Sequence, residues 1–121
     1  MSESTQVIRG GEFLIRETAA SEIFIPEEWT EEQLMMKQMT LDFVAQRILP
    51  ILDRIESQEE GLVPSLMEEA GELGLTGSSV PEIYGGLGLD FKTTMLITEA
   101  IGGAHSFSVS FSAHTGIGTL P

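Results

Sequence analysis

The sequence of 121 residues contains no cysteine and only 6 lysines and arginines. The absence of cysteine excludes a disulfide framework, a thiolate metal site and a cysteine nucleophile, and it favours a cytoplasmic location without fixing it. Because 19 acidic residues leave a formal net charge of −13, nucleic acid and anionic membranes are not expected partners. The N-terminus shows no basic start followed by an apolar stretch, so no secretion signal is expected.

A long hydrophobic run is also missing. Residues 100–121 carry no formal charge, but only nine of these 22 residues are apolar, too few for a membrane-spanning helix. An uncharged, semi-polar segment of this kind is typical of a surface that protein or ligand covers. If nothing in the chain covers it, we expect the chain to be an incomplete part of a larger protein.

Apolar residues recur at helical spacing between residues 30 and 55. Thr30 and Gln33 have the spacing of a capping box, which predicts a helix start at this point. Pro50 should kink or split the helix, because it has no N–H to donate. The apolar stripe consists of Met36, Met39, Phe43, Val44, Ile48, Ile51, Leu52 and Ile55.

Two further helices are predicted downstream. Pro64 suits the first turn of one, and Gly74 is placed to end it in a left-handed cap. Asp90 is the expected N-cap of the other. Their apolar positions are, in order, Leu66, Met67, Ala70 and Leu73, then Phe91, Met95, Ile97 and Ile101. The pattern predicts an all-α domain over residues 30–121, preceded by an extended arm over residues 1–29.

Residues 106–113 break the helical pattern. Serine alternates strictly with apolar residues here, a period of two that by itself predicts a half-buried strand. No strong second strand candidate lies nearby to pair with it, and an isolated strand leaves its backbone groups without partners. The local pattern therefore conflicts with the helical prediction around it.

No motif in the sequence completes a catalytic or metal site. The glutamates at 59–60 and 68–72 are typical of a solvated helix face, because nothing places an apolar wall beside them to raise a pKa. His105 and His114 lack a spacing typical of metal ligands, so no metal is expected. Gly86–Gly88 begins a dinucleotide fingerprint but its third glycine is missing, which favours a compact turn.

Three segments, taken in order, resemble motifs of the N-terminal domain of acyl-CoA dehydrogenases. They are Glu72–Leu75 (ELGL), Val80–Asp90 (VPEIYGGLGLD) and Ala113–Pro121 (AHTGIGTLP). Ile83 stands where the family more often has glutamate. Residues 10–15 and 30–55 look like the long-chain or very-long-chain branch, so the resemblance covers almost the whole chain.

The resemblance implies an FAD-dependent enzyme of three domains, of which this chain is the N-terminal helical domain, truncated before the middle β-domain. Such enzymes use a carboxylate base and FAD to convert a fatty acyl-CoA to trans-2-enoyl-CoA in β-oxidation, and pass the electrons to an electron-transfer flavoprotein. FAD is bound mainly by the absent domains, which also carry the base. We therefore expect no catalytic residue here, an inactive isolated chain and a homo-oligomeric parent enzyme.

The resemblance also implies a helix at about residues 106–120, against the strand prediction, and makes it a wall of the acyl-chain pocket. The lining positions correspond to Val109, Ser110, Ala113 and Ile117. Because Ala113 is small, a deep pocket for long acyl chains is expected. Packing of these four residues against the absent domains is an open alternative. A self-contained, non-catalytic acidic helical module that binds a protein partner through residues 100–121 is another.

Overall fold

The computed structural model describes residues 8–23, 25 and 28–119, and the chain forms two compact units, residues 1–30 and 31–121. In the first unit the backbone forms two 3₁₀ turns, η1 (Glu12–Leu14) and η2 (Ala20–Glu22), where the sequence predicts an extended arm. Glutamate side chains close both turns, since Arg9 N and Ala19 N donate to Glu12 and Glu22. The parts of the predicted arm at residues 1–7, 24 and 26–27 lie outside the described residues.

The second unit begins with a helical segment whose geometry changes along its length. The α-helix α1 (Glu31–Phe43) continues as the π-helical turn η4 (Val44–Ile48), the 3₁₀ turn η5 (Leu49–Ile51) and α2 (Leu52–Glu56). The irregular turns lie around Pro50, which confirms that this proline interrupts the helix. The predicted stripe packs into the core, and its buried members are Phe43, Val44, Ile48 and Ile55.

Helix α3 (Leu62–Glu72) ends as the sequence predicts. Gly74 has a φ of +79°, a left-handed conformation that residues with a Cβ rarely adopt. Its N–H donates to the carbonyl of Gly71, and the N–H of Leu75 donates to that of Ala70, both at 2.9 Å. These two bonds form a Schellman motif, which turns the chain so that Leu75 is buried.

The loop between α3 and α4 folds back on itself around the 3₁₀ turn η6 (Glu82–Tyr84). The N–H of Leu87 donates to the carbonyl of Gly77 at 3.0 Å, and that of Leu89 to Ser78 at 2.8 Å. Gly86 lies so close to the opposite side of the loop that a Cβ there would be 2.1 Å from the carbonyl oxygen of Val80. The glycine-rich segment is thus a compact turn, as predicted.

Helix α4 (Phe91–Ile101) starts at the predicted N-cap, since Asp90 Oδ1 accepts a hydrogen bond from Thr93 N at 2.9 Å. The predicted apolar face is only half right, because Phe91 and Met95 are 78% and 49% exposed. The buried stripe is rotated to the neighbouring positions Thr93, Leu96, Ile97, Ala100 and Ile101. This stripe packs along α1, and Gln33 Nε2 donates to Thr93 Oγ1 at 3.1 Å between the two helices.

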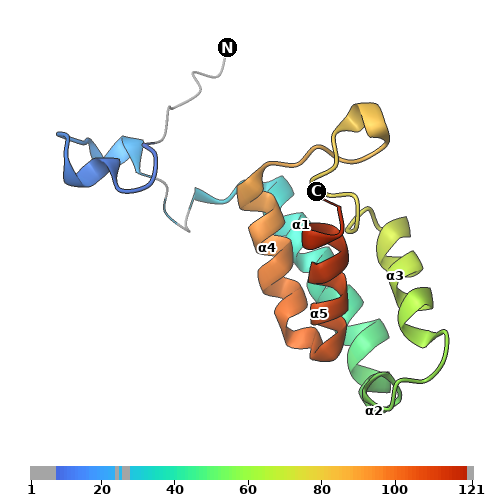
Figure 1. Cartoon of the computed structure of the whole chain (residues 1–121). Helices are drawn as coiled ribbons and strands as arrows, with labels where there is room; N and C mark the ends of the chain where they lie inside the picture. Colours follow the sequence, from blue (N-terminus) through green and yellow to red (C-terminus); the bar gives the residue numbers. More distant parts are fainter. Residues whose placement is uncertain (1–7, 24, 26–27, 120–121) are drawn as a thin grey trace. The chain divides into compact units, whose positions relative to one another are not determined.

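The chain then passes through the 3₁₀ turn η7 (Gly102–Ala104) into α5 (Ser106–Ser112) and the π-helical turn η8 (Ala113–Ile117). Figure 1 shows α5 within the bundle, where it contacts α2 and α3. Phe107 is fully buried, with its ring centroid 6.0 Å from that of Phe43. The described residues contain no strand, so the all-α prediction is confirmed and the strand pattern of residues 106–113 is overridden.

Candidate functional site

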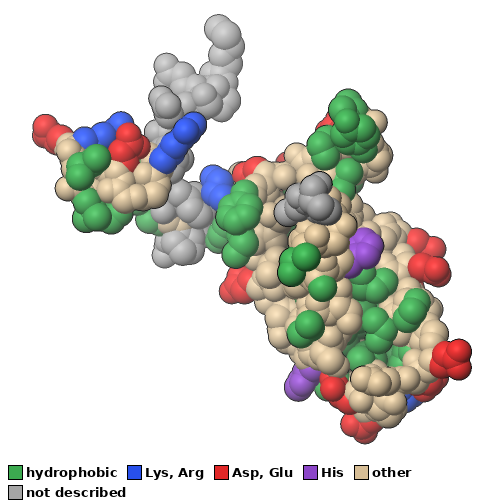
Figure 2. All heavy atoms as spheres, viewed as in Figure 1, with side chains coloured by type: hydrophobic (Ala, Val, Ile, Leu, Met, Phe, Trp, Pro, Cys, Tyr) green, Lys and Arg blue, Asp and Glu red, His purple; other side chains and the backbone are tan. Residues whose placement is uncertain are grey.

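Helix α5 and turn η8 carry an apolar surface that faces outward. Val109 and Ile117 are 69% and 86% exposed, and Ala113 between them is exposed as well. These three residues, which we call the α5 wall, border one shallow hollow of about 360 Å³ together with Ser108 and Ser112. Figure 2 shows hydrophobic side chains on this face of the molecule. The structure therefore brings three of the four predicted pocket residues together.

The alternating sequence of α5 explains this surface. In an α-helix, residues two positions apart point about 200° away from each other, so alternate apolar residues fall on opposite faces. Phe107 and Phe111 accordingly face the core and are 0% and 3% exposed, whereas Val109 and Ala113 face outward. The pattern that resembles a half-buried strand is thus that of a helix with two apolar sides, of which one is buried among the described residues of the second unit.

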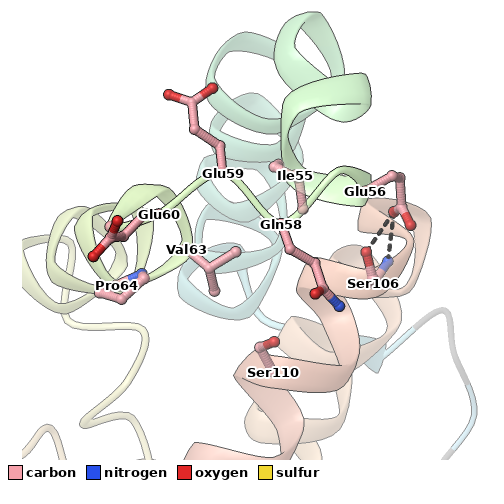
Figure 3. A pocket seen from close by; sticks show the side chains of 10 residues that line it. Ile55, Glu56, Gln58, Glu59, Glu60, Val63, Pro64, Ser106 and Ser110 are labelled. Carbon is pink, nitrogen blue, oxygen red and sulfur yellow. Dashed lines mark hydrogen bonds between the residues drawn. The ribbon is translucent and has the colours of Figure 1, made fainter.

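Ser110, the fourth predicted residue, lies at a different hollow. It borders a space of about 400 Å³ between α5 and residues 55–64, on the same side as Ser106 (Figure 3). The lining here includes Glu56, Gln58 and several other polar residues. Ser110 therefore lies on a different side of α5 from the α5 wall.

Glu56, which the sequence analysis does not single out, holds the start of α5. Its carboxylate accepts hydrogen bonds from the hydroxyl and the backbone N–H of Ser106, the latter at 3.3 Å. These bonds, the side-chain one foremost, lower the pKa of Glu56. His105, at the N-cap position, makes no side-chain cap bond, so a glutamate 50 residues away replaces the local cap. No local sequence signal reports such a contact.

A third hollow, of about 400 Å³, lies between α4, η8 and the loop that precedes α4. The exposed Phe91 and Met95 border it, and Ser112 borders both this hollow and that of the α5 wall. The hydroxyls of Thr98 and Thr115 donate to backbone carbonyls of their own helices at 2.9 Å. These bonds occupy two of the hydroxyls of a hollow that is lined by apolar residues and by further serines and threonines.

Two of these hollows, the one at the α5 wall and the one beside Phe91, have no charged residue in their lining. Within the described residues, no group of three or more His, Asp or Glu side chains could hold a metal ion. The last lysine or arginine of the sequence is Lys92, so residues 93–121 offer no strong cation to the pyrophosphate of FAD or of CoA. The hollow at the α5 wall is therefore suited to an apolar group rather than to an anionic one.

Comparison with known proteins gives the family. The sequence model of "Acyl-CoA dehydrogenase, N-terminal domain" matches residues 30–121. A probable acyl-CoA dehydrogenase of Bacillus subtilis is 44% identical over 119 residues, which cover 98% of this chain and 20% of that protein. An acyl-CoA dehydrogenase of the same organism is 37% identical over 93 residues, 76% of this chain and 24% of the relative.

A solved structure agrees with these relatives. The crystal structure of an acyl-CoA dehydrogenase complexed with FAD from Bacillus anthracis superimposes with a TM-score of 0.88 at 42% identity, and covers 95% of this chain and 20% of that chain. The chain therefore belongs to the acyl-CoA dehydrogenase family and has the fold of its N-terminal helical domain. It spans about a fifth of the length of these relatives.

The described part of the chain contains no helix that is both long and apolar enough to cross a bilayer. The family and the fold predicted from the sequence are confirmed. The roles of Val109, Ser110, Ala113 and Ile117 and the long-chain branch stay predictions.

Proposed function

We propose that the protein containing this chain is an FAD-dependent dehydrogenase that converts a fatty acyl-CoA to trans-2-enoyl-CoA in β-oxidation. In this proposal the chain contributes one wall of the acyl-chain pocket. The observation that supports it best is the two-sided helix α5. Its inner phenylalanines are buried, whereas Val109, Ala113 and Ile117 form an outward apolar surface beside a hollow.

Each residue of the wall has a defined part in the proposal. Val109 and Ile117 contact the acyl tail and exclude water from it, which favours binding in proportion to the apolar area covered. Ala113 has only a methyl group, so it leaves room between them for a long chain. Ser110, at the neighbouring hollow, belongs to the same wall only if the pocket extends around α5. FAD, held by the rest of the protein, supplies the hydride acceptor.

The remaining parts of the proposal concern the whole protein. We infer an electron-transfer flavoprotein as its electron acceptor, a homo-oligomeric assembly and a cytoplasmic location. The carboxylate base lies outside these 121 residues, so the chain alone is inactive. The likeness of residues 10–15 and 30–55 supports the long-chain branch, and the small side chain of Ala113 supports a pocket for long acyl chains.

A single preparation tests the proposal. The full reading frame that encodes these residues is expressed, and palmitoyl-CoA and butyryl-CoA are added in turn under anaerobic conditions. We expect a yellow protein whose flavin absorbance bleaches with palmitoyl-CoA, more slowly with butyryl-CoA, and not with free CoA. A reading frame that stops after residue 121, or a product that binds no flavin, would instead support the non-catalytic module that binds a partner through residues 100–121.

A further inference from the structure

The N-terminal unit contains a closed loop, residues 8–22, which we call the arm loop. The backbone N–H of Ile8 donates to the carbonyl of Glu22 at 3.0 Å and brings the two ends together. Arg16 forms ion pairs with Glu12, at 3.7 Å, and with Glu22. The arm loop therefore has internal structure of its own.

The arm loop presents its largest apolar side chains to the outside. Phe13, Leu14 and Ile15 are 54%, 76% and 86% exposed, and no described residue of this unit is buried. Single exposed apolar residues are normal on protein surfaces, but three large ones in direct succession concentrate exposed apolar surface, which is typical of interaction sites. We call the arm loop with these three exposed side chains the knob. Its internal ion pairs hold its conformation.

Two of the relatives differ in length, and this difference bears on the arm loop. An alignment of 119 residues that spans 20% of the first Bacillus subtilis relative gives that protein about 600 residues, and 93 residues that span 24% give the second about 390. The alignment with the longer protein covers 98% of this chain and so includes the arm loop. The alignment with the shorter one has about the length of the family match at residues 30–121.

We propose that Phe13, Leu14 and Ile15 dock into an apolar pocket in the same polypeptide. This pocket is formed by the roughly 200 residues by which the longer relative exceeds the shorter one. This rests on the proposed function in one respect, that the chain is part of an enzyme of the longer kind. Residues 8–25 contain three glutamates and two arginines, so the knob has no net positive charge to attract an anionic bilayer. Its closed loop reduces the ordering entropy that docking would cost.

Photo-crosslinking in the full-length protein tests the contact. The photoreactive residue p-benzoylphenylalanine replaces Phe13 or Ile15, and the adducts are located by mass spectrometry. Ser21, an exposed polar residue of the same loop, is the matched control position. We expect adducts from positions 13 and 15 within the segment that has no counterpart in the 390-residue relative, at least tenfold above those from position 21. Adducts within residues 31–119, adducts to a second copy, or no protein adducts at all would overturn the proposal.

Hydrogen exchange of the same protein gives a second readout. Leu14→Asp should accelerate exchange in the crosslinked peptides of the additional segment, whereas Ser21→Asp should leave it unchanged. Equal exchange in both variants would also overturn the docking contact. Palmitoyl-CoA turnover is measured in parallel, so that a protein with the crosslinks but no turnover refutes the proposed function alone, and one with turnover but no crosslinks refutes the docking alone.

Discussion

Gly86→Ala should destabilise the helical domain strongly, although it adds one methyl group to an exposed loop. The new Cβ would lie 2.1 Å from the carbonyl oxygen of Val80, whereas real contacts of this kind stay above 3.0 Å. The two sides of the loop must therefore separate by about 1 Å, which strains the packing by about 1–3 kcal/mol. Val80 O also accepts from Gly88 N at 2.8 Å, and weakening that bond costs about 1 kcal/mol more.

The matched control is Gly102→Ala. Gly102 has helical dihedral angles and no atom within 4 Å of the added Cβ, so the variant should gain about 0.5 kcal/mol by restricting the unfolded chain. Urea unfolding followed by far-ultraviolet circular dichroism measures both free energies. A difference of about 3 kcal/mol between the two alanine variants is expected. Free energies of unfolding that differ by less than about 1 kcal/mol between the two variants would refute the close approach of Gly86 to Val80.

Two further predictions use the same assay. Phe107→Ala should lower the free energy of unfolding by about 3–5 kcal/mol, because it empties a fully buried site between two other phenylalanines. Val109→Ala, on the exposed face of the same helix, should change it by less than about 0.5 kcal/mol. Equal losses in the two variants would contradict the two-sided helix. Asp90→Ala should cost about 1 kcal/mol at neutral pH, by loss of the N-cap. Hydrogen bonding to Thr93, its side chain foremost, lowers the pKa of Asp90 below its ordinary 3.8. The stability that Asp90 adds over the alanine variant should therefore be complete above pH 3.8 and shrink as the pH falls through the lowered pKa. A stability difference between the native protein and Asp90→Ala that stays constant down to acidic pH would contradict the N-cap role of Asp90.

Most of the fold could be predicted from the sequence because its signals are local. The N-cap at Asp90, the left-handed cap at Gly74 and the interruption at Pro50 each depend on the dihedral angles or hydrogen bonds of a few neighbouring residues. The structure has all three where the sequence places them. Amphipathic spacing likewise identified most of the core side of the first helical segment.

The remaining features depend on contacts between distant parts of the chain. The rotation of α4 that exposes Phe91 and Met95 is set by packing on α1, since both faces of α4 contain apolar residues. Ser106 is held by Glu56 across 50 residues. The alternation in residues 106–113 predicts a strand when only one buried face is assumed. The family resemblance predicted the helix, and the structure shows that this helix has two apolar sides.

The same reasoning limits what could be said of the candidate site. The family resemblance assigned Val109, Ser110, Ala113 and Ile117 to one pocket wall, but the structure places Ser110 at a different hollow from the other three. Adjacent residues on a helix point about 100° apart, so a pocket that includes both Val109 and Ser110 must wrap around α5.

The central claim is that the α5 wall contacts the acyl chain, and Ala113→Phe in the full-length protein tests it most directly. Ala45→Phe, at an exposed position of the other π-helical turn, is the matched control. The account predicts that kcat/KM for palmitoyl-CoA falls at least about tenfold more than kcat/KM for butyryl-CoA in Ala113→Phe, and that the ratio is unchanged in Ala45→Phe. Equal losses for both substrates in Ala113→Phe would contradict the claim and make the wall a packing surface.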